Sequence, residues 1–313
     1  MTSAKASRTR TPTATKAAEP RIIVVTKRTS YRRLILEERD PRARNLISRK
    51  DPSVSSWVRA HREHERTLET VERVLGKSGL PVLWVRRAHA LFDTSGASLV
   101  IAIGGDGTLL AASHNVDTVP LLGVNSAPNH SVGFFCAARR ENFAELFEQA
   151  LERRLRHVTL TRMKVVVNGR LRSSRVLNEA LYAHSSPAAT SRYLVELDGL
   201  REDQRSSGFW IGPASGSTAA QRSAGGRVMP LSSKQLQLVV REPYAPFDQK
   251  YRLLKKQFSP DQTLIVHSKM DDAMLWLDGP NRQIPIRLGD IVEFGVSDMP
   301  LTVLGLSSKR TIL

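Results

Sequence analysis

The 313-residue chain has a single cysteine, Cys136, and few aromatic residues, which make up 6% of the sequence. One cysteine excludes a disulfide within the chain and fits a reducing compartment; we interpret Cys136 as a small core residue. No apolar stretch approaches the roughly 20 residues of a membrane-spanning helix, so we expect no membrane partner. With 41% hydrophobic and 25% charged residues, the chain is typical of a globular protein and is long enough for two domains.

Acidic residues are scarce compared with basic ones, 30 against 47, which gives a formal net charge of +17. Residues 21–95 hold 17 basic and nine acidic residues, so the excess lies in the N-terminal third. Such a field attracts nucleic acid or a multiply phosphorylated small molecule. Because the sequence contains no recognised nucleic-acid-binding module, we expect a phosphorylated small substrate and no nucleic-acid partner.

Residues 1–20 contain almost nothing apolar and one acid, Glu19, beside four basic residues. A segment of this composition cannot bury enough surface to order itself, which predicts a disordered basic tail. The same acid-poor, Ser-rich composition suits an organelle transit peptide. We therefore expect a cytoplasmic protein, with an organelle as the alternative if the tail is a targeting signal.

Residues 21–156 alternate short apolar runs with helical patterns, which predicts an α/β domain with a doubly wound parallel sheet. The expected strands are 21–26, 81–85, 99–103 and 120–124, and the expected helices are 57–79 and 141–155, with a loop and broken helix over 27–56. His61 and His64 share a face of the first helix. No further metal ligands lie nearby in the sequence, so both are predicted to be solvated.

Residues 157–313 have a different pattern, with short segments of alternating apolar and polar residues. Turn pairs separate these segments, such as Asn168-Gly169, Asp198-Gly199 and Asp278-Gly279. This pattern predicts a β-rich, mainly antiparallel C-terminal domain. The expected strands are 164–168, 192–198, 209–211, 235–240, 264–267, 274–277, 291–294 and 301–304.

A glycine-rich turn follows the apolar run 99–103 and precedes a second apolar run. Glycine frees the backbone to turn sharply, and the junction of a parallel strand with a helix N-terminus is a usual place for phosphate. Asp106 lies in the middle of this turn. A carboxylate there is unfavourable near phosphate unless it binds a metal or takes a proton, so the turn indicates phosphoryl transfer or hydrolysis. The predicted phosphate-binding residues are Gly104, Gly105, Gly107 and Thr108.

Two further stretches carry groups suited to a nucleotide. Asn178 and Glu179 can offer donors and acceptors to the edge of adenine. The segment 212–226, GPASGSTAAQRSAGG, has small residues and hydroxyls that let a ligand approach the backbone closely. It is not a P-loop, because no GK[ST] follows its glycines. The earlier turn is not a dinucleotide fingerprint either, because Leu110 occupies the place of the third glycine.

In this order and spacing, GGDGT, Asn178-Glu179 and the GST-to-SAGG segment resemble the NAD kinase family over nearly the whole chain from residue 21. The segments 125–135, 177–192, 223–231 and 239–243 are most similar to plant-type NADH kinases. The resemblance implies an α/β N-terminal domain followed by a β-rich NAD-binding domain. It also implies transfer of the γ-phosphoryl group of ATP to the adenosine 2′-hydroxyl of NAD⁺ or NADH, with Mg²⁺ or another divalent metal, and a homodimer or homotetramer.

The resemblance also implies residue roles. Asp106 would contact the ribose and accept the proton of its hydroxyl, beside Gly107. Asn178 and Glu179 would hold adenine, and Thr218, Ala219 and Ser223 would line the dinucleotide. No side chain of this pattern implies a dedicated metal site on the protein.

Three positions bear on which dinucleotide, NAD⁺ or NADH, accepts the phosphoryl group. Many NAD kinases carry Asp-Gly where this chain has Ser207 and Gly208, and Tyr after Thr-Ala where it has Ala220. Loss of a carboxylate and an aromatic surface should change how the nicotinamide half is held, which leaves NAD⁺ and NADH open as acceptors. Arg205 matches a basic position of the family and is a candidate phosphate contact.

Two other function classes stay open. Lipid kinases of the diacylglycerol and sphingosine type share GGDGT but differ in the second motif. A non-catalytic dinucleotide sensor would keep the pocket without turnover, although it would have no need of Asp106. The sequence also leaves open whether the donor is ATP or polyphosphate.

Overall fold

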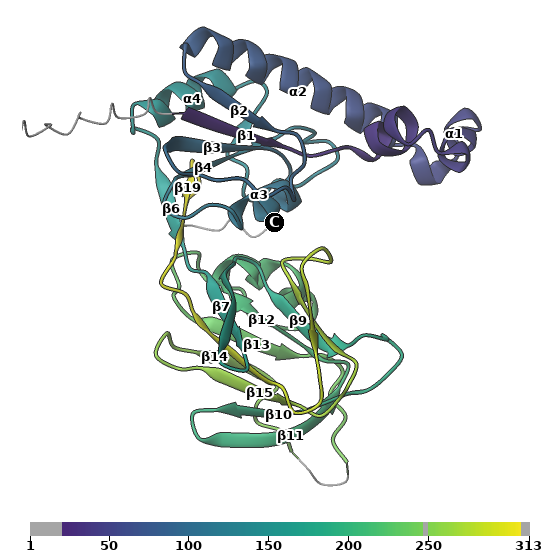
Figure 1. The fold of residues 1–313 in the computed structure, drawn as a ribbon, viewed down its shortest axis with the longest axis vertical. Coiled ribbons are helices and arrows are strands. Elements are labelled where there is room, and N and C mark those ends of the chain that lie inside the picture. Colours follow the sequence, from purple (N-terminus) through teal and green to yellow (C-terminus); the bar gives the residue numbers. More distant parts are fainter. Residues whose placement is uncertain (1–20, 247–249, 308–313) are drawn as a thin grey trace, which may run out of the picture.

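The computed structural model describes residues 21–246 and 250–307; the predicted tail at residues 1–20 lies outside them. Its N-terminal part is built on a seven-stranded sheet in the order β2-β1-β3-β4-β19-β6, with β5 paired to β4 (Figure 1). All pairings in this sheet are parallel except that of β19 with β6. The strands are β1 (Arg21–Thr26), β2 (Val82–Val85), β3 (Ala97–Gly104), β4 (Leu121–Asn125), β5 (Ala138–Arg139), β6 (His157–Leu160) and β19 (Leu301–Leu304).

Helices cover both faces of this sheet, because its central strands are apolar on both sides. On one face, Val71 and Leu75 pack with Phe143 and Phe147 over Ile22 and Val24. On the other face, Leu109 and Ala112 pack over the remaining side chains of the same strands. The helices of this part are η1 (Arg32–Glu37), α1 (Pro41–Ser48), η2 (Pro52–Val54), α2 (Trp57–Ser78), α3 (Asp106–Ser113) and α4 (Phe143–Leu151).

The C-terminal part is a sandwich of two six-stranded antiparallel sheets around one apolar core. One sheet has the order β11-β10-β15-β18-β7-β8, with β7 (Met163–Val167), β8 (Arg170–Val176), β10 (Ser191–Leu197), β11 (Leu200–Ser206), β15 (Leu264–Ser268) and β18 (Ile291–Val296). The other has the order β14-β13-β12-β9-β16-β17, with β9 (Ala180–His184), β12 (Phe209–Pro213), β13 (Leu236–Val240), β14 (Lys255–Phe258), β16 (Ala273–Leu277) and β17 (Gln283–Ile286). The helical turns η3 (Ala214–Thr218) and α5 (Ala220–Ser223) follow β12.

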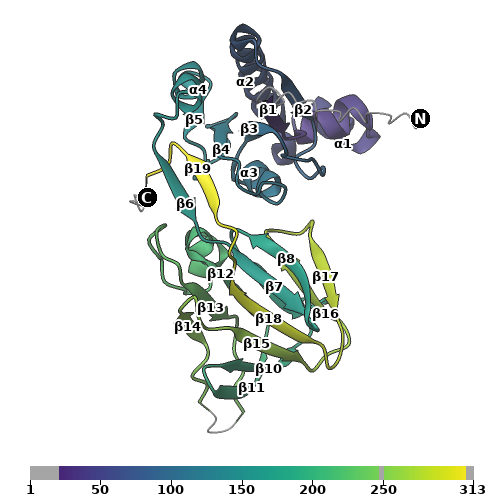
Figure 2. The same ribbon diagram turned by 60° about the vertical axis from the view of Figure 1, so that its left-hand side comes forward.

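The two parts meet at α3, which lies between the N-terminal sheet and the sandwich in both views (Figures 1 and 2). Leu177 and Leu231 of the C-terminal part are buried in the same apolar cluster as Leu109 of this helix. The N-terminus of α3 is thus held where the two parts face each other. Among residues 21–246 and 250–307, no helix is long and apolar enough to span a bilayer.

The predicted fold class is confirmed: a parallel-sheet α/β part is followed by a β-rich part. The turn pairs Asn168-Gly169 and Asp198-Gly199 connect β7 to β8 and β10 to β11 with positive φ at both residues, as two-residue hairpins require. The domain limits at 156 and 157 stay a prediction, and β6 and β19 both lie in the N-terminal sheet.

The prediction that His61 and His64 are solvated is wrong. Both side chains are buried, because α2 turns this face toward the loops at the carboxyl ends of β1 and β4. His61 Nδ1 lies 3.0 Å from the Thr29 hydroxyl and His64 Nδ1 lies 2.8 Å from the Ser126 hydroxyl. Hydrogen bonding of this kind compensates the burial of a neutral imidazole.

Candidate active site

A cavity of about 1020 Å³ lies beside the N-terminus of α3, with walls from both parts of the chain. The carboxyl ends of β1 and β3 supply Lys27 and the glycine turn, as expected for an open parallel sheet. The sandwich supplies Glu179 and the turn after β16, residues 278–281. Of the predicted phosphate and catalytic residues, the cavity wall includes Gly105, Asp106, Gly107 and Thr108.

Asp106 is the first residue of α3, and its carboxylate is held in one orientation by two backbone donors. The N–H of Phe135 donates to Oδ1 at 2.7 Å and the N–H of Phe134 donates to Oδ2 at 2.9 Å. A carboxylate has about four acceptor sites, so each oxygen keeps capacity for a further donor. The side chain is therefore a fixed acceptor on the cavity wall.

Two glycines of the turn, Gly104 and Gly105, are required by close contacts. A Cβ on Gly104 would collide with the side chain of Thr108, and one on Gly105 would collide with the Ser131 hydroxyl. A Cβ on Gly107, by contrast, would meet nothing within 4 Å. Gly107 therefore leaves open space above the first turn of α3, where unpaired N–H groups favour an anion.

On the opposite wall, Asp278 organises the loop that carries Asn178 and Glu179. Its carboxylate accepts hydrogen bonds from the N–H groups of Leu177, Asn178 and Glu179 at 2.8, 2.7 and 3.2 Å. Its Oδ2 also lies 2.8 Å from Nε2 of His114, the residue that ends α3, and both side chains are almost fully buried. Asp278 thus ties the loop of the sandwich to the helix that begins with Asp106.

Glu179 is partly buried, and its enclosed Oε2 atom has unmet hydrogen-bonding capacity. Burial, and secondarily the negative charge of Asp278, raises the pKa of Glu179 to about 8. Glu179 Oε2 and Asn178 Oδ1 have no hydrogen-bond partner among the described residues. Buried polar atoms of this kind are usually paired, so both atoms are suited to a ligand.

Four basic residues line the cavity, and they differ in how they are paired. Arg28 and Arg33 form ion pairs with Glu38, both at 3.4 Å. Lys27 and Arg87 form no salt bridge with any residue that the structure describes. Burial lowers the pKa of the Lys27 amine, although Glu63 and Cys136 oppose this effect.

Cys136 lies near Lys27 but is only partly buried as a residue, so it does not belong to the apolar core. Burial of its thiol, and secondarily the charge of Asp106, raises the pKa of Cys136 to about 12. The thiol is therefore neutral at physiological pH, and we assign it no chemical role.

The remaining predicted residues lie on the sandwich, outside the cavity wall. The segment 212–226, which we call the small-residue loop, packs closely on the Asn178 segment. A Cβ on Gly216 would collide with the Asn178 carbonyl. Thr218 and Ala219 lie in this loop and are partly buried. Ala220 and Ser223 line a separate hollow of about 730 Å³.

Arg205 and Ser207 lie beyond this loop. Ser207 lines a smaller hollow of about 290 Å³, which shares Arg241 and Glu242 with the hollow beside Ala220. Arg205 is exposed on β11, which both views place far from the N-terminal sheet (Figures 1 and 2). The structure therefore does not bring Arg205 to the cavity.

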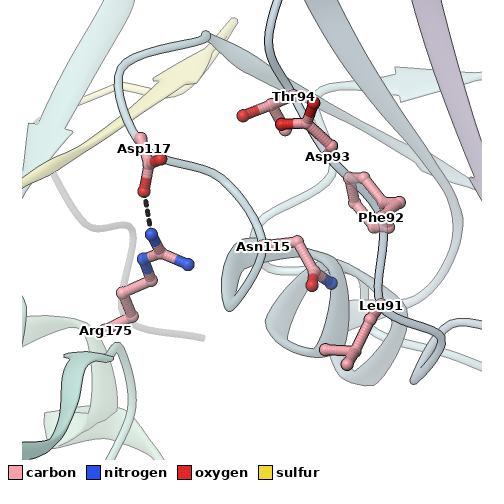
Figure 3. A pocket seen from close by; sticks show the side chains of 7 residues that line it. All are labelled: Leu91, Phe92, Asp93, Thr94, Asn115, Asp117 and Arg175. Carbon is pink, nitrogen blue, oxygen red and sulfur yellow. Dashed lines mark hydrogen bonds and ion pairs between the residues drawn. The ribbon is translucent and has the colours of Figure 1, made fainter.

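A further hollow of about 460 Å³, drawn in Figure 3, is less suited to phosphate. Arg175 is the basic residue on its wall, and its guanidinium is paired with Asp117 and donates to the His114 carbonyl. Asp93 adds a second carboxylate to the same wall. We therefore place the candidate active site in the cavity at Asp106.

Sequence reasoning missed several residues of this site. Lys27 and Arg87 gave no signal beyond the general basic excess of the N-terminal third. Asp278 was recognised only as part of a turn pair, although its place before glycine at the end of a strand is one where function often resides. His114 gave no signal, because its contact with Asp278 depends on the packing of α3 against the sandwich.

The fold and cavity define a nucleotide-binding α/β protein in which a fixed carboxylate begins a helix. The family model described as ATP-NAD kinase N-terminal domain matches residues 59–155. A probable NADH kinase of Oryza sativa is 33% identical over 262 residues, covering 77% of this chain and 80% of the relative. An NADH kinase of Arabidopsis thaliana is 35% identical over 278 residues, covering 78% and 84%.

Solved structures agree in fold. An NAD kinase from Archaeoglobus fulgidus in complex with ATP superposes with a TM-score of 0.64 at 20% identity, covering 90% of this chain and 92% of that one. Yeast NADH kinase complexed with NADH gives 0.67 at 13% identity, covering 93% and 84%. The chain belongs to the NAD kinase family.

Proposed function

We propose that this protein is an NAD(H) kinase, which transfers the γ-phosphoryl group of ATP to the adenosine 2′-hydroxyl of NAD⁺ or NADH. The observation that carries the proposal is the Asp106 carboxylate, fixed by the N–H groups of Phe134 and Phe135 on the wall of the 1020 Å³ cavity. Family membership supports the reaction class, since the plant relatives are named as NADH kinases.

Asp106 would act as the proton acceptor. The sugar hydroxyl becomes a better nucleophile when a carboxylate takes its proton as the oxygen attacks phosphorus. The two backbone donors fix the direction of the carboxylate before substrate binds, so no reorganisation is needed during the reaction. In this scheme the attacking oxygen lies beside Asp106 and its proton goes to a carboxylate oxygen.

The donor phosphates would lie over the first turn of α3. Gly105 and Gly107 let them approach the backbone, and Lys27 and Arg87 supply positive charge from the neighbouring wall. Electrostatic stabilisation of the transferring group is the main protein contribution in phosphoryl transfer. Four of the 17 basic residues in 21–95 line the cavity.

A divalent metal fits this site as a companion of the nucleotide. The described residues contain no group of three His, Cys, Asp or Glu side chains that could hold a metal. Mg²⁺ needs only one or two carboxylates when phosphates and water complete its shell, and the Asp106 carboxylate lines the cavity. When bound, the metal would neutralise charge on the phosphates. Holding the acceptor and taking its proton would fall to the protein.

The dinucleotide would run from the cavity across the Asn178 loop to the small-residue loop. The unpartnered Asn178 Oδ1 and Glu179 Oε2 suit the donors of adenine or ribose. With a pKa of about 8, Glu179 carries a proton at neutral pH and can donate as well as accept. Thr218, Ala219, Ala220 and Ser223 would line the rest of the ligand.

Initial rates with Mg-ATP, with NAD⁺ and NADH as separate acceptors, test the proposal. Formation of NADP⁺ or NADPH, followed by a coupled dehydrogenase, is the expected result. Binding of either dinucleotide without product would overturn it in favour of a sensor. Polyphosphate in place of ATP identifies the donor.

Two further expectations belong to this proposal. A homodimer or homotetramer is tested by light scattering of the purified full-length chain. A cytoplasmic location is tested by fractionation of cells that express the chain with and without residues 1–20.

A further inference from the structure

Arg162 is fully buried, with an exposed fraction of 0%, at the place where the chain passes between its two parts. Residues 161 and 162 form the whole connection from β6, in the N-terminal sheet, to β7, in the sandwich. The return passage, residues 297–300, connects β18 of the sandwich to β19 of the N-terminal sheet (Figure 2). The Ser297 N–H donates to the Arg162 carbonyl at 2.9 Å, so the two passages are joined at this residue.

The guanidinium group of Arg162 binds the carboxyl end of α3. Its Nη1 atom donates to the Ser113 carbonyl at 3.2 Å and to the Val116 carbonyl at 2.9 Å. Arg175, on β8 of the sandwich, donates to the His114 carbonyl at 2.7 Å. The last carbonyl groups of a helix have no partners within the helix, and this end of a helix favours positive charge. Two arginines from outside the N-terminal helices therefore hold the carboxyl end of α3.

The Arg162 guanidinium is incompletely paired. Its Nε and Nη2 atoms have no hydrogen-bond partner among the described residues, and the group forms no salt bridge with them. Burial, and secondarily the charge of Arg175, lowers the pKa of Arg162 to about 10, which leaves the group charged at neutral pH. A buried charge without a carboxylate partner is unfavourable for folding. Stability alone therefore does not account for this side chain.

The opposite end of α3 carries Asp106. The helix has eight residues, which corresponds to a length of about 12 Å, so a shift or tilt of its carboxyl end also moves its first residue. The loop with Asn178 and Glu179, which we assign to the acceptor, joins β8 to β9 within the sandwich. The contacts of Arg162 thus connect the proposed base to the part of the chain that would hold the acceptor.

We propose that Arg162 is a positioning residue: by holding the carboxyl end of α3 at the passage into the sandwich, it places Asp106 against the hydroxyl that attacks phosphorus. The inference rests on the proposed kinase function. Arg162 does not line the cavity, so it acts through α3 rather than on a substrate. A displacement of about 1 Å at a reacting group can lower a rate about 100-fold.

The test measures kcat and KM for ATP, NAD⁺ and NADH in the wild type, Arg162→Met and Arg162→Lys. Arg162→Met should lower kcat about 10- to 100-fold but change KM for the dinucleotides by less than about threefold, because the loops assigned to them lie within the sandwich. Arg162→Lys keeps a donor for the two carbonyls and should recover part of the lost kcat. Arg172→Met, at an exposed position of β8, is the matched control and should keep the wild-type kcat.

Two measurements separate positioning from folding. Urea unfolding, followed by circular dichroism, gives the folded fraction of each variant, and kcat is expressed per folded molecule. If Arg162→Met does not fold, Arg175→Met removes the donor to the His114 carbonyl from a partly exposed position and should also lower kcat. Amide hydrogen exchange of residues 106–113 without substrate, measured by mass spectrometry, should be faster in Arg162→Met than in the wild type and unchanged in Arg172→Met.

The outcomes distinguish the two proposals. A wild-type kcat per folded molecule in Arg162→Met, or an equal loss in Arg172→Met, would overturn the positioning role while the kinase function stands. Absence of product with the wild type would overturn the kinase function. The exchange measurement then decides by itself whether Arg162 holds α3, and unchanged exchange in Arg162→Met would show that it does not.

Discussion

Glu179 should give the stability of this protein a distinctive pH dependence. Burial of its carboxyl group, and secondarily the nearby charge of Asp278, raises the pKa of Glu179 to about 8 from the ordinary 4.5. Between these pH values the unfolded chain loses this proton while the folded chain keeps it. The unfolded state then binds fewer protons, so the free energy of unfolding falls as pH rises through this window. Below 4.5 and above 8 the contribution of Glu179 is constant.

The size of the effect follows from the same two values. They differ by about three and a half pH units, and each unit corresponds to about 1.4 kcal/mol, which gives an upper value of about 5 kcal/mol. Water that enters the cavity when the group ionises reduces the penalty. We therefore expect Glu179→Gln to gain about 2–5 kcal/mol relative to the wild type between pH 4.5 and pH 8.

Urea unfolding at pH 4.5, 6 and 8, followed by circular dichroism, measures this difference. The other titrating groups are common to both proteins. Subtracting one dependence of the free energy of unfolding on pH from the other therefore isolates the contribution of Glu179. Glu148→Gln, at an exposed position of α4, is the control, and its free energy of unfolding should show the same pH dependence as that of the wild type. A constant difference between Glu179→Gln and wild type across this range would show that Glu179 is ionised in the folded protein, and the reasoning would be refuted.

Three other predictions concern the cavity and its support. Asp106→Asn should lower kcat by about 10²–10⁴ with little change in dinucleotide affinity, since the amide cannot take the proton; equal turnover of the two proteins would exclude Asp106 as the base. Arg87→Gln should raise KM for ATP several-fold at low salt, whereas Arg86→Gln, exposed and outside the cavity wall, should leave it unchanged. Burial, followed by the charge of Lys27, lowers the pKa of His64 to about 3, so stability is lost as pH falls from about 6.5 toward 3. His64→Gln should therefore reduce the dependence of the melting temperature on pH over this range.

The features that could be predicted from the sequence are those set by neighbouring residues. The run at 99–103 is buried on both faces, and the glycines that follow it form the turn before α3 as expected. The hairpin turns at Asn168 and Asp198 were predictable for the same reason, because Asn-Gly and Asp-Gly adopt positive φ at low cost. In each case the decisive contacts lie within a few residues.

The features that could not be predicted depend on contacts between distant segments. His64 looked solvated because its hydrogen-bond partner, Ser126, follows β4, far along the chain. β6 and β19 have the alternating pattern of the sandwich strands, yet they pair with each other in the N-terminal sheet. Short alternating strands carry no signal that says which sheet they join.

Asp278 shows why sequence motifs alone do not predict a site formed between two parts of a chain. Its turn was evident, but its carboxylate acts on Leu177, Asn178 and Glu179 and contacts His114 at the far end of α3. One helix thus begins with the proposed base and ends against the group that shapes the opposite wall. Movement of α3 would displace both walls together. Asp278 therefore couples the Glu179 loop to α3, together with the apolar packing of Leu177 against Leu109.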